Sequence, residues 1–478
     1  MKRLRGRVLA GLILATVPSW SSAASWEVKP FLEISGTYAD NLYLQPAGQT
    51  KSDFVTQINP GVSLVGEGPR LDLRFDYRLQ NLLYASSEKL NSSYQQILGA
   101  FDSELMKDLL YFDGDAAYRQ MVVDPERDIG QGNISINTFR QNIATSRLTP
   151  YLKRRLGGWA ESELRYSREA VRFLDGNSTT YTEDSVSDIV SGNLADARTA
   201  DRWGWRLGFY SRKVKYTPGL RPRETWQNVR SSLDYLVGRK LSLNGTLGYE
   251  KNEYQRGGGV PALSGAFWTV GFDWRPSPRT SFRLSRGERY FGPVWNLELS
   301  HRGRRTEASA SYIHDLNTRA RTLVSVPVYD SNGNPVINPN TSEQLIGRIP
   351  VNEVFIRQLG QLNLEFRTRK SRSRVGIYRE IRDYQQSGRQ EDINGAFLAW
   401  RWSLTRRGSL NLESRFTLMD VAVLNAYTDD MITSSVSYRK ELGQKSTATV
   451  EYERTRRARS NTTDYSENLL AVRLIISL

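Results

Sequence analysis

The chain has no cysteine and only two histidines among its 478 residues. The first absence excludes a disulfide framework, a cysteine-ligated zinc, a thiol nucleophile and a lipid-modified N-terminal cysteine. The second argues against a metal or catalytic centre built from histidine. The acidic pairs Asp429-Asp430 and Asp102/Glu104 suggest solvated loop carboxylates rather than the convergent oxygen cluster that calcium needs. We therefore expect no enzyme, no catalytic residue, no metal and no cofactor.

Long hydrophobic runs are also absent from the chain beyond its first residues. Hydrophobic residues make up 39% of the sequence and the mean hydropathy is −0.53, and no segment is apolar enough for a membrane-spanning helix. Residues 1–24 are different, because Lys2, Arg3, Arg5 and Arg7 precede a short apolar run and then small residues. This arrangement predicts a secretory signal peptide that is cleaved near residue 23 or 24. The protein is therefore expected to be exported.

Strict alternation of apolar and polar residues fills the rest of the chain. Leu71, Leu73, Phe75 and the next odd positions alternate with charged residues such as Asp72. Similar alternation recurs at 203–210, 361–367, 396–404 and 410–418. In a β-strand the two sets point to opposite faces. One face therefore suits lipid and the other suits water.

The connections alternate between tight, mostly basic turns and longer polar loops. The tight turns lie at 66–70, 106–108, 153–158, 195–201, 237–240, 275–279, 301–305, 368–371, 405–408 and 441–445. The longer connections include 39–52, 86–93, 124–137, 173–183, 254–263 and 317–352. Short periplasmic turns and longer external loops are typical of an all-β fold, the transmembrane antiparallel β-barrel.

Counting the turns predicts about 22 strands over residues 25–478, with 18–20 as the alternative. The strands near 139–152 and 183–196 carry the weakest pattern. A secreted soluble sandwich or solenoid is the competing fold, but the strands are long and no fixed repeat is present. The first strand is expected near Trp26, which leaves no room for an N-terminal plug domain of the kind found in TonB-dependent receptors.

The inward face of the predicted barrel carries charges of both signs. Eight residues are expected to line the lumen: Arg74, Arg78, Arg206, Arg230, Glu365, Arg367, Glu413 and Arg415. Such charges either brace the wall across neighbouring strands or line a polar channel.

The basic turns and the longest loop each allow two interpretations. The cations of the turns either anchor the barrel to anionic lipid headgroups or form a positive funnel for an acidic polymer. The loop 317–352 contains the hairpin signal Asp330-Ser331-Asn332-Gly333. It is either an exposed loop or a partial plug that gates the lumen. Outer-membrane lipids are the expected partners, and no nucleic-acid motif is present.

Two stretches near the N-terminus carry a family resemblance. Residues 29–44 read KPFLEISGTYADNLYL and residues 54–86 read FVTQINPGVSLVGEGPRLDLRFDYRLQNLLYAS. With their Asp40-Asn41 loop, Pro60-Gly61 kink and long alternating strand, they resemble the outer-membrane β-barrel family associated with exosortase/PEP-CTERM systems. The apolar last strand resembles the outer-membrane assembly signal, although that signal usually ends in Phe and this chain ends in Leu478.

The resemblance implies a channel or scaffold that assists export or assembly of an extracellular polysaccharide, in the bacterial cell outer membrane. The exopolysaccharide and its secretion machinery would then be partners. A general or anion-preferring diffusion porin is the main alternative, because a porin and a polymer exporter share the same sequence pattern. An outer-membrane enzyme and a purely structural surface protein are two further alternatives.

Overall fold

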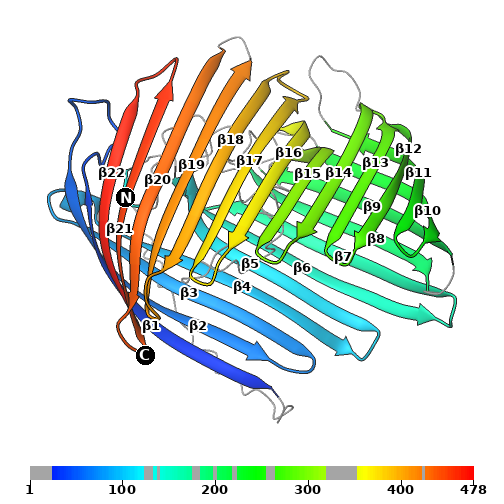
Figure 1. The fold of residues 1–478 in the computed structure, drawn as a ribbon, viewed down its shortest axis with the longest axis horizontal. Coiled ribbons are helices and arrows are strands. Elements are labelled where there is room, and N and C mark those ends of the chain that lie inside the picture. Colours follow the sequence, from blue (N-terminus) through cyan, green and yellow to red (C-terminus); the bar gives the residue numbers. More distant parts are fainter. Residues whose placement is uncertain are drawn as a thin grey trace, which may run out of the picture.

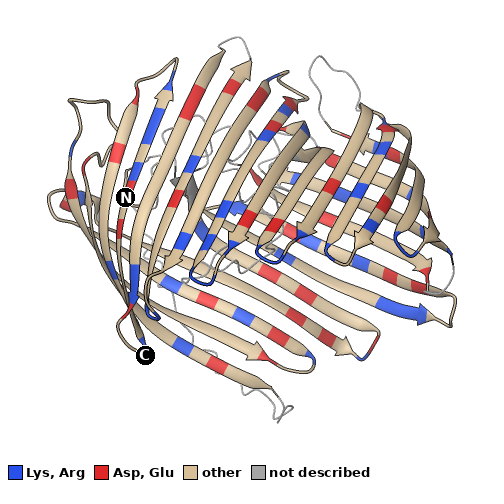
Figure 2. Ribbon diagram, viewed as in Figure 1, with Lys and Arg blue, Asp and Glu red and all other residues tan. Residues whose placement is uncertain are grey.

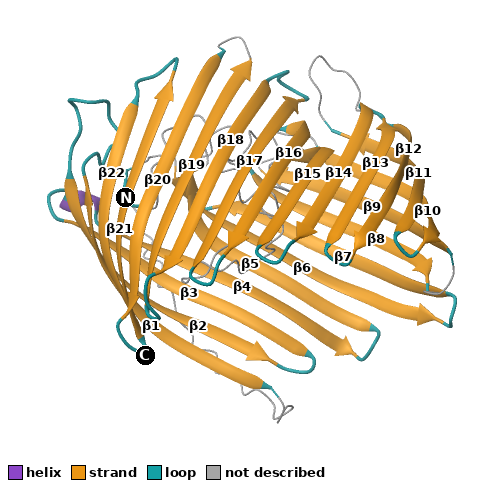
Figure 3. Cartoon of the chain, in the orientation of Figure 1, coloured by secondary structure: helices purple, strands orange, loops and turns teal. Residues whose placement is uncertain are grey.

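The computed structural model of the chain is a closed antiparallel β-barrel (Figure 1). It describes residues 24–122, 133–136, 140–174, 183–197, 202–217, 223–254, 264–318, 353–422 and 426–478. Within these ranges it is almost entirely strand, with one short 3-10 helix, η1(Glu88–Leu90) (Figure 3). No helix in the described ranges is long and apolar enough to cross a membrane.

The barrel has 22 strands, as the count of turns predicts. They are β1(Ser25–Ala39), β2(Asp53–Glu67), β3(Leu71–Tyr84), β4(Ser92–Met106), β5(Leu110–Val122), β6(Arg140–Leu156), β7(Ala160–Phe173), β8(Asp184–Asp196), β9(Trp203–Thr217), β10(Glu224–Gly238), β11(Leu241–Glu253), β12(Gly265–Ser277), β13(Thr280–Arg289), β14(Gly292–Arg302), β15(Thr306–Thr318), β16(Val354–Arg367), β17(Ser371–Tyr384), β18(Gln390–Ser403), β19(Gly408–Ala422), β20(Tyr427–Glu441), β21(Ser446–Arg459) and β22(Tyr465–Ser477). The weakly patterned strands of the sequence are β6 and β8, and both are present.

Each strand pairs with its neighbours in the sequence, and β22 closes the barrel by pairing with β1. The closing register runs from Phe31 opposite Ser477 to Ala39 opposite Leu469. Closure matters because a lipid environment offers no partner for the backbone groups of an open sheet edge. The two chain-terminal strands therefore begin and end at the same end of the barrel, together with the ten predicted tight turns, which is the periplasmic end.

Alternation along the strands produces two chemically different faces. In β16 the even positions Leu362 and Leu364 are each 49% exposed and Phe366 is 42% exposed. The odd positions Arg357 and Leu359, earlier in the same strand, are buried. The exposed apolar face must be the outer wall, because only lipid is a favourable environment for it. The opposite face is then the wall of the lumen.

Pairs of aromatic side chains mark the periplasmic border of the outer apolar face. Trp159 and Trp205 lie with ring centroids 6.1 Å apart, and Trp203 and Tyr235 are 4.4 Å apart. Such rings gather at the interface between hydrocarbon and water, where an apolar body and a polar edge are both satisfied. The aromatic residues of the sequence therefore set the depth of the barrel in the membrane.

The tight periplasmic turns agree with the prediction, but the external end departs from a strict short–long alternation. β13 and β14 are joined externally by only Tyr290 and Phe291. The predicted signal peptide lies outside the described residues apart from its last residue, and so does the loop 317–352, apart from its first two residues. The hypothesis that this loop is a plug or gate stays a prediction.

The two faces predict that the same substitution at neighbouring positions of β19 lowers stability by different amounts. Phe416 lies near the middle of the strand on the outer face and is 40% exposed, so Phe416→Arg should cost about 2–4 kcal/mol of stability in a bilayer. Thr417→Arg, on the lumen face, is the matched control and should cost far less. Urea titration of the barrel refolded into vesicles measures both.

The same register predicts the labelling of single cysteines in this cysteine-free chain. A water-soluble thiol reagent should reach positions 365 and 413 and should not reach positions 364 and 412. The reverse pattern would contradict the assignment of the two faces.

Candidate functional site

Charges of both signs are distributed along the strands of the barrel (Figure 2). On the lumen wall, ion pairs cross between neighbouring strands. Arg382 of β17 is the clearest example, since its side chain is 4% exposed and lies 2.8 Å from Glu380 and 3.1 Å from Glu391. Arg389 lies 2.9 Å from the same Glu391, and Tyr384 Oη donates a hydrogen bond to it at 3.0 Å. Burial of a charge is costly unless the charge is paired. In this cluster Arg382, Glu380 and Glu391 each have an ion-pair partner.

Similar pairs occur at other points around the wall. Asp429 is fully buried and lies 2.6 Å from Arg457, so the prediction that this carboxylate is solvated in a loop was wrong. It belongs to β20, and its negative charge is matched by an arginine of β21. In the part of the chain that the structure describes, no group of three or more histidine, cysteine or acidic side chains could hold a metal ion.

The strand register places the predicted arginines of β3, β9 and β10 on the polar face. Arg78 forms an ion pair with Glu33 at 2.9 Å and donates from Nε to Gln96 Oε1 at 3.1 Å. Arg74 lies opposite small or apolar residues of β2 and β4. Arg206 lies opposite alanine and serine, and Arg230 lies between two glycines. Arg78 thus braces the wall, and Arg230 is exposed.

The predicted residues of β16 and β19 differ in their ion pairing. Glu365 forms ion pairs with Arg367 of its own strand and with Arg372 of β17, the latter at 2.8 Å. Glu413 and Arg415 are exposed, and their register partners on both neighbouring strands are uncharged. The structure therefore brings together only the Glu365–Arg367 pair among the eight predicted residues.

Several important lumen residues were not singled out from the sequence. They include Glu33, Arg212, Arg382 and Arg457, all at most 6% exposed. Each lies on the charged side of an alternating strand, so the alternation could have identified its face. Its partner could not be identified, because pairing between strands depends on the register.

Residues 133–136, from the connection between β5 and β6, lie against the lumen wall. Tyr84 Oη donates to the carbonyl of Ile134 at 2.8 Å, and the amide of Ile136 donates to the carbonyl of Leu42 at 2.8 Å. Ser135 Oγ donates to the buried Glu467 of β22. This segment therefore joins the loop after β1, the inner face of β3 and the inner face of β22.

An apolar cluster underlies this contact on an otherwise polar wall. It consists of Ala39, Leu42, Val55, Leu82, Tyr84, Ile134 and Leu469. Packing apolar side chains inside a water-filled lumen is favourable only where a second layer covers them. Residues 133–136 supply part of that layer and occupy space beside the seam between β1 and β22.

The periplasmic mouth is strongly basic along one arc, from the turn after β10 to the turn after β20. The exposed cations of this arc, here called the basic arc, are Arg239, Lys240, Arg275, Arg279, Arg302, Arg304, Arg305, Arg369, Lys370, Arg406, Arg407 and Lys445. The described turns after β2 and β4 carry only Arg70 and Lys107, whereas the exposed cations Lys153, Arg154 and Arg155 lie at the periplasmic end of β6.

Two features continue the basic arc into the barrel. One row of the strand register contains three arginines on neighbouring strands. Arg372 of β17 lies opposite Arg367 of β16 and Arg401 of β18. Next to them in the barrel wall, a pocket of about 820 Å³ opens beneath the turns after β10, β12 and β14. Its lining includes Arg279 and Arg302 together with several hydroxyl groups. The entrance can therefore bind negatively charged groups.

The two histidines lie in different surroundings. His301 Nδ1 lies 2.8 Å from Thr280 Oγ1 at the periplasmic rim. The ring of His314 packs against Phe291, with centroids 5.1 Å apart.

Comparison with solved structures identifies the class of fold. The FrpB iron transporter from Neisseria meningitidis (F3-3 variant) matches with a TM-score of 0.53 at 13% identity, over 94% of this chain and 81% of that chain. The siderophore receptor PirA from Acinetobacter baumannii matches with a TM-score of 0.53 at 8% identity, over 95% and 80%. The ferric enterobactin receptor PfeA from Pseudomonas aeruginosa also gives 0.53, at 9% identity, over 96% and 82%.

No protein-family model matches the chain, and no curated protein matches it. The likeness to solved structures shows the fold alone at these identities. The protein is a 22-strand β-barrel of the bacterial outer membrane. Its candidate functional site is the lumen, with the basic arc at the periplasmic end and residues 133–136 folded against the wall.

The ion pair between Arg382 and Glu380 predicts how a single and a double substitution change the free energy of unfolding. Arg382→Met should destabilise the barrel by about 3–5 kcal/mol, because Glu380 is left buried without its ion-pair partner. The double variant Arg382→Met/Glu380→Leu should recover a large part of this loss. Urea unfolding of the refolded barrel measures the effect, and equal losses in both variants would contradict the assigned pairing.

The inward-folded segment predicts a change in conductance. Ile134→Asp places a charge in the apolar cluster, which should release residues 133–136 from the wall and raise single-channel conductance in a planar bilayer. Ile189→Asp makes the same chemical change on the lumen face of β8, away from this cluster, and is the control. Unchanged conductance in the Ile134 variant would show that the segment does not narrow the lumen.

Proposed function

We propose that the protein is an outer-membrane channel through which an acidic extracellular polysaccharide leaves the cell. The basic arc is the observation that carries this proposal. A polymer with carboxylate or phosphate groups arriving from the periplasm would meet a broad positive surface at the entrance, which raises its local concentration and its rate of capture. The resemblance to the exosortase-associated barrels points to the same class of cargo.

The lumen wall suits passage of a hydrated polymer rather than retention. Most of its arginines are neutralised by acidic partners, as in the Arg78–Glu33 and Arg357–Asp315 pairs. Hydroxyl groups on this face also pair across strands, as in Thr149 of β6 and Ser167 of β7 at 2.9 Å. A polyanion would then be bound at the mouth and held only weakly beyond it.

The protein would act without catalysis or a cofactor. The named solved structures of similar fold are a transporter and receptors, which supports transport as the general activity. The surface polysaccharide and the machinery that delivers it to the periplasmic mouth would be the partners.

A diffusion porin is the second candidate. The same basic arc would give a porin a preference for small anions, and the exposed Arg230 in the lumen would add to it. The two candidates differ in cargo size, so they separate in the cell and in a bilayer.

The direct test is a deletion strain assayed for surface polysaccharide. Loss of most of the polysaccharide from the surface, with complementation by the intact gene, is the result expected of an exporter. Normal surface polysaccharide together with reduced uptake of small anions would identify a porin instead.

Charge reversal tests the role of the basic arc. The variant Arg279→Glu/Arg302→Glu/Arg304→Glu should lower surface polysaccharide about tenfold, because electrostatic capture changes rates by roughly 10- to 1000-fold. The control Arg70→Glu/Lys107→Glu reverses two exposed charges at the same end of the barrel, in turns outside the basic arc. An equal, small effect of both variants on polysaccharide, with altered insertion into membranes, would favour anchoring to lipid headgroups.

A further inference from the structure

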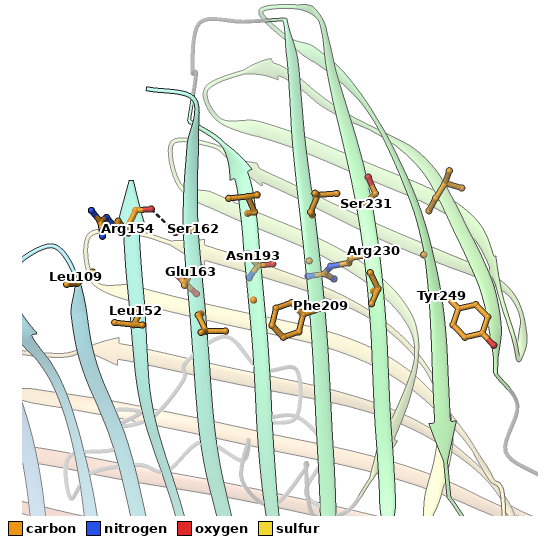
Figure 4. A pocket seen from close by; sticks show the side chains of 18 residues that line it. Leu109, Leu152, Arg154, Ser162, Glu163, Asn193, Phe209, Arg230, Ser231 and Tyr249 are labelled. Carbon is orange, nitrogen blue, oxygen red and sulfur yellow. Dashed lines mark hydrogen bonds between the residues drawn. The ribbon is translucent and has the colours of Figure 1, made fainter. Parts of the chain in front are cut away.

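The inner face of β9 to β11 follows from the exposure and register of these strands. Phe209 of β9 and Tyr249 of β11, both labelled in Figure 4, are 44% and 55% exposed and belong to the lipid-facing rows. The adjacent residues Tyr210 and Glu250 therefore point into the lumen. Strand pairing places these two residues in one row with Asn228 of β10.

The external ends of β15 and β16 cover part of this inner face. Leu316 of β15 and Val354 of β16 share the strand parity of the lipid-facing leucines of β16, but they are only 8% and 3% exposed. Both belong to an apolar cluster with Tyr254, against which Trp226 of β10 packs. Trp226 points into the lumen, because it lies two positions before Asn228. The ends of β15 and β16 therefore lie on the lumen side of β10.

The short hairpin of β13 and β14 leaves room for this covering. β14 pairs with β15 only as far as Leu297 opposite Tyr312, whereas β15 and β16 remain paired out to Thr318 opposite Val354. Residues 313–318 thus have β16 as their only strand partner in the described part of the chain. This end of β15 is free to leave the wall and reach β10.

A pocket of about 100 Å³ lies where the inner face and this covering meet. Two neighbouring rows of the wall line it, namely Tyr210, Asn228 and Glu250, and Arg212, Trp226 and Asn252. Trp226 is two residues from the external start of β10, so the pocket lies at the external exit of the lumen. One buried water needs about 10–15 Å³ of such space, so the pocket accepts a group several times larger, such as a sugar ring.

Aromatic rings give the pocket its apolar surface. Trp226 is held by stacking on Tyr254, with ring centroids 4.9 Å apart and ring planes 13° apart. Tyr210 and Tyr290 add two more rings to the lining. The rings of Trp and Tyr combine an apolar body with a polar group. A pyranose is complementary, because C–H groups cover its faces and hydroxyl groups surround its edge.

Two polar groups of the lining lack partners. Asn252 is 6% exposed and its backbone amide donates to Ser264 Oγ at 3.0 Å, but its side chain makes no hydrogen bond within the described ranges. Arg289 Nε likewise has no hydrogen-bond partner among the described residues. A buried polar group without a partner is costly. Ligand hydroxyls would satisfy both, since a hydroxyl both donates and accepts.

The charges of the pocket are already paired. Arg289 lies 2.6 Å from Glu250, and Arg212 lies 3.1 Å from Glu169. A carboxylate would therefore have to compete with Glu250 or Glu169 for these arginines. The pocket suits an uncharged ligand, in contrast to the basic arc at the periplasmic mouth.

We propose that this pocket binds one uncharged pyranose unit at the external exit of the lumen. Trp226 packs against the sugar ring, and Asn228 and Asn252 form hydrogen bonds with its hydroxyl groups. The assignment rests on the proposed function, because the sugar would be a neutral unit of the exported polysaccharide. Acidic units of the polymer would meet the basic arc on entry, and neutral units would meet this pocket on exit.

The test uses the purified full-length barrel in detergent, with the methyl pyranosides of glucose, galactose, mannose and N-acetylglucosamine as probes. A saturation-transfer NMR titration should show saturable binding of at least one of them. Asn252→Leu keeps the size of the side chain and removes its amide, so it should weaken binding about tenfold. Trp226→Leu should weaken binding by a similar factor. Heat-modifiable gel mobility verifies that each variant is folded.

The matched control is Asn244→Leu. Asn244 lies on the same face of β11, closer to the periplasm, and does not line the pocket. Its replacement should leave binding unchanged. Equal losses in the Asn244 and Asn252 variants, tighter binding of methyl glucuronoside than of any neutral probe, or no saturable binding of any probe would each overturn the proposal.

This result is distinguishable from that of the deletion strain. Saturable binding together with unchanged surface polysaccharide in the deletion strain would support the pocket and contradict export. Loss of polysaccharide on deletion without saturable binding would support export and contradict the pocket.

Discussion

Everything in this structure depends on satisfying backbone hydrogen bonds in lipid. A strand in hydrocarbon must pair on both edges, so the sheet has to close, and here β22 closes it against β1. Closure then fixes which face meets lipid and which encloses the lumen. The aromatic border at Trp159 and Trp205 and the apolar outer wall follow from that single requirement.

Closure also creates the need for charge pairing inside. A polar inner wall that is partly covered by its own side chains and by residues 133–136 leaves buried charges. These are held by ion pairs, as between Arg382 and Glu380, or by backbone amides, as at Asp53. The pairs neutralise many lumen arginines, but Arg74, Arg206 and Arg230 lie opposite uncharged residues. A larger group of exposed cations lies at the periplasmic mouth, where it can act on an approaching polyanion.

The sequence by itself determined the strand number, the turns and the two faces, because the two-residue alternation and the tight basic turns are local properties of the chain. Only the tertiary structure decided which charges meet. Asp429 was misjudged as a solvated loop residue because its partner Arg457 lies on the next strand, 2.6 Å away. The contact of Ile134 with Tyr84 was equally hidden, because it joins a loop to a wall fifty residues away in sequence. Ion pairs and loop contacts depend on register and chain closure, and no local pattern encodes these.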